Sequence, residues 1–122
     1  MHEIIATLAR SPIVSQLEII NRVDEPDLQV LYLKAQLIDG SALYIRETIT
    51  PTLDKYSYHW QTGDGKLIRR WDNAPHWPSV ATYPHHCHVE SQDNVQPSEQ
   101  PTIIEVIEFI TQQITFSQLQ GG

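Results

Sequence analysis

The segment from Arg69 to His88 (RRWDNAPHWPSVATYPHHCH) concentrates the residue types that do chemistry. It holds four of the six histidines of the chain, two adjacent arginines, an Asp-Asn pair and three prolines. A segment with so little apolar surface cannot offset the conformational entropy that it loses on ordering, so it must be held by a scaffold formed by the chain on either side. We therefore place the functional site in this segment.

The first chemistry that this segment predicts is metal-independent cleavage of a phosphodiester. One histidine would take a proton from the attacking hydroxyl and another would protonate the leaving oxygen, while Arg70 stabilises the charge on phosphorus. The histidines available for these roles are His85, His86 and His88. Our first hypothesis is therefore an endoribonuclease that needs no cofactor, with Glu47 and His76 as further catalytic candidates.

The second chemistry is metal binding, because imidazoles and carboxylates are the ligands that Zn²⁺ and similar divalent ions prefer. If residues 86–88 are extended, His86 and His88 share one face of a strand and His85 takes the other. A third ligand can come from His76, Asp72 or Glu47. Our alternative hypothesis is thus a metal-dependent hydrolase with His76, His86 and His88 as ligands of Zn²⁺ or another divalent ion.

A third hypothesis involves no chemistry. Histidines in proline-rich turns often hydrogen-bond the local backbone and fix a loop, and Asp72 and Asn73 can do the same by capping turns. The motif would then form a rigid surface that binds a partner.

The scaffold begins with a β-hairpin over residues 31–49, in which apolar and polar residues alternate. A three-residue loop, Ile38 to Gly40 with Gly40 left-handed, puts the apolar residues of both strands on one face. The same register puts Glu47 beside Ile45 on the buried side of the sheet. A carboxylate there needs a cation or hydrogen-bond donors.

A second hairpin is predicted over residues 55–72. If Asp64-Gly65 is its two-residue loop, His59 faces Arg70 and Ser57 faces Asp72. The opposite face then carries aromatic rings with a cation over them. We assign binding or structural roles to five residues of this hairpin and its end: Tyr58, His59, Trp71, Asp72 and Asn73.

The remaining segments complete an α+β fold. Residues 2–9 have the apolar spacing of a short helix, and residues 14–23 fit a strand or a continuation of that helix. The prolines of residues 73–84 exclude a helix and indicate a stiff loop, and residues 89–101 are expected to form a mobile loop. A capping box from Thr102 to Glu105 opens a C-terminal helix. We predict a twisted antiparallel sheet of about five strands, with an N-terminal and a C-terminal helix.

Length and composition limit the classes of protein. The 122 residues suit a single domain, 1–122, and no apolar run is long enough to cross a membrane. The lone Cys87 and the lack of a signal-like N-terminus predict a cytoplasmic protein. The net charge of −7 argues against broad nucleic-acid binding, so any contact with RNA is expected to be local, around Arg69 and Arg70.

Several motifs of this sequence resemble those of the TumE-type toxin family of prokaryotic toxin-antitoxin pairs. They are DGSAL at 39–43, Glu47, YSYHWQ at 56–61, RWDNAPH at 70–76 and TYPHHCH at 82–88. The family often has histidine where this chain has Trp77. The resemblance implies a cytoplasmic toxin of a type II-like pair, encoded beside a DNA-binding antitoxin that neutralises it. RNA and a second copy of the chain, in a homodimer, are the further partners that we expect.

Overall fold

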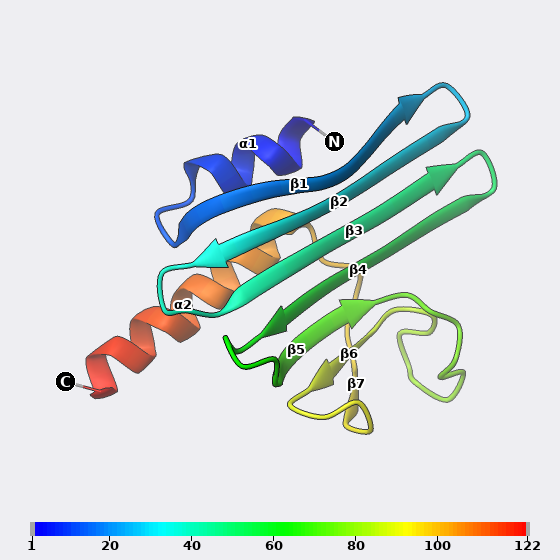
Figure 1. Cartoon of the computed structure of the whole chain (residues 1–122). Helices are drawn as coiled ribbons and strands as arrows, with labels where there is room; N and C mark the ends of the chain where they lie inside the picture. The colour runs from blue at the N-terminus through cyan, green and yellow to red at the C-terminus, as the bar shows by residue number, and fades with distance from the viewer. Residues whose placement is uncertain (1, 122) are drawn as a thin grey trace.

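The computed structural model describes residues 2–121, without the side chains of residue 2 and of residues 119–121. Within this range seven strands form one antiparallel sheet, and their order in the sheet is their order in the chain (Figure 1). The elements are α1 (His2–Arg10), β1 (Val14–Glu25), β2 (Leu28–Leu37), β3 (Ala42–Thr50), β4 (Leu53–Gln61), β5 (Leu67–Asp72), β6 (His86–Val89), β7 (Val95–Pro97) and α2 (Ile103–Gly121). None of the helices described is long and apolar enough to span a membrane.

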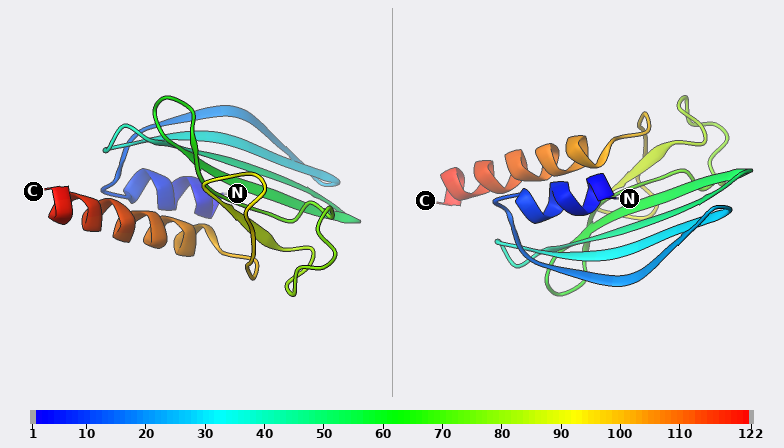
Figure 2. Two further views of the ribbon diagram at one scale, coloured as in Figure 1. Left: turned by 90° about the horizontal axis from the view of Figure 1, so that it is seen from below. Right: turned by 90° about the horizontal axis from the view of Figure 1, so that it is seen from above.

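Both helices lie on the same side of the sheet, side by side (Figures 1 and 2). Their apolar residues pack on the apolar face of β2–β5 and form the core, in which Leu8, Leu33, Ile45 and Ile110 are completely buried. The predicted capping box opens α2: the Thr102 backbone N–H donates to Glu105 Oε1 at 3.0 Å, and the Glu105 N–H donates to Thr102 Oγ1 at 3.1 Å. The face of the sheet turned away from these helices is left free to carry polar residues.

The first hairpin has the predicted register. Leu33 lies opposite Ile45 and Leu31 lies opposite Glu47, so the Glu47 carboxylate points to the side of the sheet that the helices cover. The three-residue loop is also confirmed: the Leu37 N–H donates to the Ser41 carbonyl at 2.9 Å, and Gly40 has a φ of +88°. Gly40 takes this conformation at low cost because it has no Cβ.

The second hairpin has the predicted strand partners but a different loop. His59 lies opposite Arg70 and Ser57 opposite Asp72. The loop contains three residues, 63–65, because the Thr62 N–H donates to the Lys66 carbonyl at 2.8 Å. A bulge at Ile68 then shifts the register by one residue and restores the expected pairing. The prediction of a two-residue Asp64-Gly65 loop was therefore wrong, although its consequence for the site holds.

The sheet has seven strands, not about five. Residues 14–23, which fitted a strand or a helix, belong to the 12-residue strand β1. Residues 89–101, predicted to be a mobile loop, contain the last residue of β6, a turn, and strand β7, which pairs with β6. A strand of three residues is too short for an alternation to be recognised, and its pairing with β6 is a tertiary contact. Residues 73–85 form the irregular loop that the prolines predicted.

Candidate functional site

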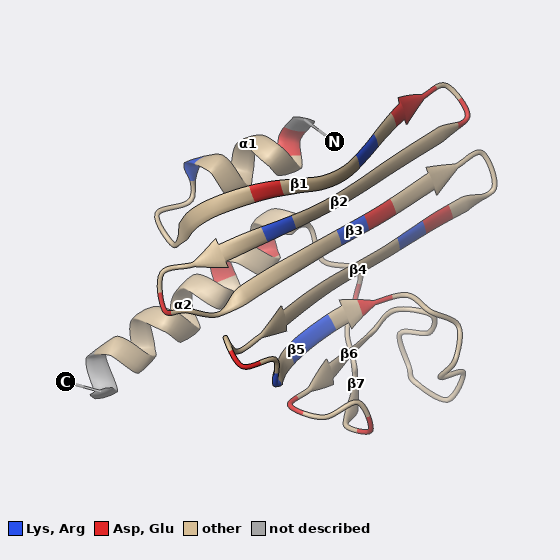
Figure 3. Cartoon of the chain, in the orientation of Figure 1, with Lys and Arg blue, Asp and Glu red and all other residues tan. Residues whose placement is uncertain are grey.

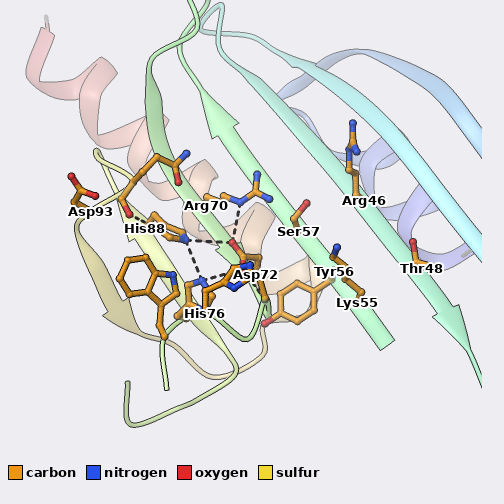
Figure 4. A pocket seen from close by; sticks show the side chains of 14 residues that line it. Arg46, Thr48, Lys55, Tyr56, Ser57, Arg70, Asp72, His76, His88 and Asp93 are labelled. Atoms are coloured by element: carbon orange, nitrogen blue, oxygen red, sulfur yellow. Dashed lines mark hydrogen bonds and ion pairs between the residues drawn. The ribbon is translucent and has the colours of Figure 1, made fainter. Parts of the chain in front are cut away.

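The candidate site lies where β4, β5 and β6 run side by side. In the pairing of β5 with β6, Asp72 is opposite His86 and Arg70 is opposite His88, while β4 places His59 opposite Arg70. Alternate side chains of a strand point to opposite faces, so all five side chains lie on the face turned away from the helices. The loop of residues 73–85 connects β5 to β6 and lets these two segments of the motif meet (Figures 1 and 4).

The rings of His86 and His88 are held by backbone carbonyls. His86 Nδ1 is 2.9 Å from the Pro84 oxygen, and His88 Nδ1 is 2.8 Å from the Gln92 oxygen. A carbonyl oxygen can accept a hydrogen bond but cannot donate one, so both Nδ1 atoms carry hydrogen. The two Nε2 atoms then face each other at 3.1 Å. Two bare nitrogen lone pairs repel at this distance, so at least one Nε2 atom must carry a proton or contact a cation.

Asp72 completes this group from the end of β5. Its Oδ1 lies 3.0 Å from His86 Nε2, and its Oδ2 lies 3.5 Å from His88 Nε2. The carboxylate is fixed by two donors, Arg70 Nε to Oδ2 and the Ala74 backbone N–H to Oδ1, each at 2.9 Å. Asp72, His86 and His88 are all buried, with at most 5% of their surface exposed.

These three residues fit a metal ion. Their ligand atoms lie within 4.8 Å of one another. Ligand atoms at about 2.0–2.1 Å from Zn²⁺ in tetrahedral geometry are about 3.3 Å from each other, and the separations of 3.0, 3.1 and 3.5 Å in this group match that value. Histidines that bind metals generally donate their second ring N–H to a carbonyl or a carboxylate, as both of these do. The site can therefore hold a divalent ion.

A cleft of about 800 Å³ opens over this group. Arg46, Lys55 and Arg70 are among the residues that line it. Figure 4 shows Arg70 beside Asp72 and His88, and Arg46 farther away, beyond Ser57. Trp77 packs edge-on against His88, with ring centroids 6.2 Å apart. The cleft thus combines three buried residues that could bind a metal with three cationic side chains. Such a surface suits a phosphate ester.

His59 supports Arg70 from the neighbouring strand. Its Nδ1 is 3.2 Å from Arg70 Nη1, and because a guanidinium can only donate, Nδ1 accepts. Burial, followed by the positive charge of Arg70, lowers the pKa of His59 below its ordinary value, so the ring is neutral near pH 7. Arg70 is thus held between His59 and Asp72.

The family model described as "Toxin TumE" matches residues 3–114, which include every residue of this site. The chain belongs to the TumE toxin family. A comparison with curated proteins and one with solved structures found no match. The membership confirms the resemblance carried by RWDNAPH and TYPHHCH, and it gives the chain the role of a toxin.

In this TumE-family chain, two of the predicted catalytic residues lie away from the cleft. Glu47 accepts a 2.6 Å hydrogen bond from the Tyr58 hydroxyl on the helix-covered side. Burial and this bond raise the pKa of Tyr58, so its hydroxyl stays protonated and donates. His85 Nδ1 is 2.9 Å from the Tyr56 hydroxyl, and its ring stacks on that tyrosine. The structure therefore corrects the expectation that Glu47 and His85 share one site with Arg70.

The other predicted residues divide between the site and its framework. His76 is exposed in the loop and lines the cleft, but the group that fits a metal contains Asp72 in its place. Trp71 is buried in the core against Phe109, with ring centroids 5.7 Å apart. Asn73 joins β4 to the end of β5, because its side chain accepts from the Tyr56 N–H at 3.1 Å and donates to the Asp54 carbonyl at 2.7 Å.

Sequence reasoning missed three residues of this TumE-family site: Arg46, Lys55 and Trp77. Arg46 belongs to the polar half of the alternation in β3, which could have placed it on the same face as His59. Trp77 stands where the family often has histidine, but no local pattern placed its ring, because its position in an irregular loop is set by packing.

Proposed function

We propose that this TumE-family toxin is a metal-dependent hydrolase that cleaves RNA, with Asp72, His86 and His88 as the metal ligands. One observation carries the proposal. Both imidazoles have their Nδ1–H groups bound to carbonyls and direct their Nε2 atoms, 3.1 Å apart, at the same point as a buried carboxylate. A cation at that point removes the repulsion between them.

The reaction we propose is hydrolysis of a phosphodiester. Water loses one proton to the solvent as its oxygen bonds to phosphorus, one P–O ester bond breaks, and the leaving oxygen takes up a proton. A divalent ion at this site would activate the water and neutralise charge on the phosphate. Arg70 binds Asp72 through Nε and His59 through Nη1, which leaves Nη2 for a phosphate oxygen. The exposed His76 lines the cleft, and in this proposal it protonates the leaving oxygen.

A metal-independent ribonuclease is the second candidate, and the same pair of histidines supports it. A single proton between the two Nε2 atoms would make one ring an acid and the other a base. In a phosphoryl transfer, however, the attacking and leaving oxygens lie roughly in line on opposite sides of phosphorus. Two nitrogens 3.1 Å apart approach from one side, so this geometry favours the metal.

The toxin role also implies an antitoxin. We propose that this partner is a DNA-binding protein encoded by the adjoining reading frame and that the toxin acts in the cytoplasm. The net charge of −7 suits a partner with a basic binding surface. A small neighbouring gene whose product binds both DNA and this chain would support the pairing.

Metal analysis of protein purified without a histidine tag tests the proposal. We expect about one equivalent of zinc or another divalent ion in the parent, and loss of RNA cleavage after dialysis against EDTA that is reversed by adding the ion back. His86→Gln and His88→Gln should lose both the metal and growth inhibition.

His85→Gln is the matched control, because it removes the neighbouring imidazole on the other face and should keep both properties. Cleavage that persists in EDTA in metal-free protein would overturn the metal-dependent function and select the metal-independent one. A parent that inhibits growth without cutting any RNA would overturn both.

A further inference from the structure

The face of β2 and β3 that no helix covers carries a patch of tyrosines and cationic side chains next to the cleft. Tyr32 and Lys34 of β2 lie opposite Arg46 and Tyr44 of β3 on this face. The two strands therefore present aromatic rings and cations alternately to solvent, with no helix among the described residues covering them (Figures 1 and 2).

These side chains stack on each other. The Arg46 guanidinium lies 3.9 Å from the centre of the Tyr32 ring, and Lys34 Nζ lies 5.7 Å from the centre of the Tyr44 ring. The ring centroids of Tyr32 and Tyr44 are 6.5 Å apart. Each cation is thus held over one face of a ring, so aromatic surface and positive charge lie at the same place.

This patch continues into the cleft. A shallow hollow of about 340 Å³ is lined by Tyr32, Tyr44 and His59, together with Arg46, Ser57 and Arg70. The last three residues also line the cleft over Asp72. One continuous surface therefore leads from the tyrosines of β2 and β3 to the histidines of β6.

The charge on this surface differs in sign from that of the whole chain. Four of the eight Lys and Arg residues of the chain belong to it: Lys34, Arg46, Lys55 and Arg70. Figure 3 shows blue segments, which mark Lys and Arg, on each of the strands β2–β5. The acidic side chains beside these four cations are Asp72, which pairs with Arg70, Asp93 at the rim of the cleft, and Glu18 of β1, opposite Lys34. The cations outnumber these carboxylates. A polyanion can therefore bind here although the net charge of the chain is −7.

We propose that single-stranded RNA binds across this face, with bases stacked on Tyr32 and Tyr44 and its phosphates on Arg46, Lys55 and Arg70. The proposal rests on the proposed function, because it names the form of RNA that enters the cleft. Open sheet faces with aromatic rings bind single strands in this way, since every base has a π face to stack.

A duplex fits this surface poorly, because its bases are stacked on each other and cannot reach the tyrosines. From β2 to β6 the surface crosses four strand spacings, about 19 Å. That length suits a short single strand, near the lower end of the roughly 4–16 nucleotides that single-strand binding folds cover.

Fluorescence anisotropy with a labelled single-stranded RNA of about 12 nucleotides tests the proposal. The full chain is used in EDTA, so that binding is measured without cleavage. Tyr44→Ala and Arg46→Ala should each weaken binding about tenfold, whereas Tyr44→Phe should bind like the parent because the ring is kept. Lys66→Ala is the matched control, since it removes an exposed positive charge from the turn between β4 and β5.

Salt dependence gives a second measurement. With three phosphate contacts, log affinity should fall with log salt with a slope of about −2, and Arg46→Ala should reduce that slope by about 0.7. A duplex of the same sequence should bind about tenfold more weakly, and single-stranded DNA should bind less tightly if the 2′-hydroxyl is contacted.

Unchanged RNA binding by folded Tyr44→Ala would overturn this proposal, as would a duplex that binds as tightly as the single strand. A Tyr44→Ala protein that loses antitoxin binding but keeps RNA binding would also overturn it, because that result would assign the face to a protein partner. These outcomes leave cleavage by the parent untouched. Conversely, a parent that binds RNA through Tyr44 but never cuts it refutes the proposed function and supports this surface.

Discussion

His85 and His86 are neighbours in the chain, yet their rings lie on opposite faces of the sheet. The His85 ring stacks on Tyr56 with ring centroids 5.8 Å apart, whereas His86 Nε2 lies 3.0 Å from Asp72 Oδ1. The alternation of side chains along an extended chain causes this separation. Two adjacent residues of one type can therefore be exchanged one at a time, and each exchange reports on one face.

Zinc should stabilise the parent protein through His86. Binding to the folded state alone raises the free energy of unfolding by about 2.7 kcal/mol when free zinc is 100 times the dissociation constant. We expect thermal melting to show this rise for the parent and for His85→Gln, and to show none for His86→Gln. Equal stabilisation of all three proteins would place the zinc elsewhere.

Replacement of Asp72 by alanine should destabilise the metal-free fold. Asp72 is buried and binds Arg70, His86 and the Ala74 backbone, so its loss leaves buried polar groups without a partner. We expect the free energy of unfolding to fall by about 3 kcal/mol in urea denaturation. Asp93→Ala, which removes an exposed carboxylate at the rim of the cleft, should change it by less than about 0.5 kcal/mol. Similar losses in both variants would contradict the assigned role of Asp72.

The bond between Tyr58 and Glu47 should matter for stability and not for toxicity. Tyr58→Phe removes a donor from a carboxylate on the helix-covered face, which should lower the free energy of unfolding by about 2 kcal/mol. Growth inhibition should persist where the protein is still folded. Tyr83→Phe, at an exposed tyrosine, is the control for loss of a hydroxyl. A stable Tyr58→Phe protein without toxicity would return Glu47 to the functional site.

His59 should make the fold sensitive to acid. Burial and the charges of Arg70 and His88 lower the pKa of His59 in the folded state, against a smaller opposing effect of Gln61. The unfolded chain therefore binds more protons as the pH falls below about 6.5, and the free energy of unfolding decreases there. In EDTA, His59→Gln should show a weaker decrease between pH 7 and pH 5 than the parent (about one proton less). Identical slopes would show that His59 titrates normally.

The capping box should stabilise α2. Thr102→Ala removes the side-chain acceptor of the Glu105 N–H and should cost about 1 kcal/mol in urea denaturation. Thr111→Ala is the control within the same helix, because its hydroxyl bonds to the Ile107 carbonyl and alanine has the higher helix propensity. It should leave stability unchanged or raise it. A larger loss at Thr111 than at Thr102 would refute this account of the helix start.

Sequence reasoning predicted the first hairpin with its loop, both helices and the strand partners of His59. These features follow from local patterns: period-two alternation, a glycine where the backbone must turn left-handed, and a threonine three residues before a glutamate. It also predicted that His86 and His88 share a face. The prediction for the loop of the second hairpin was wrong, because a two-residue loop and a three-residue loop with a bulge give the same strand partners at the site. The alternation of side chains cannot distinguish these two loops.

The sequence by itself determined which residue types are present and, through alternation, which of them share a face of the sheet. The tertiary structure decided that Asp72, and not His76, stands beside His86 and His88, and that Glu47 and His85 lie on the other side. It also decided that both Nδ1 atoms meet carbonyl oxygens, from Pro84 and Gln92. The physical reason is that ring orientation depends on where distant backbone groups lie after β5, β6 and their loops have packed together, and no local pattern encodes those positions.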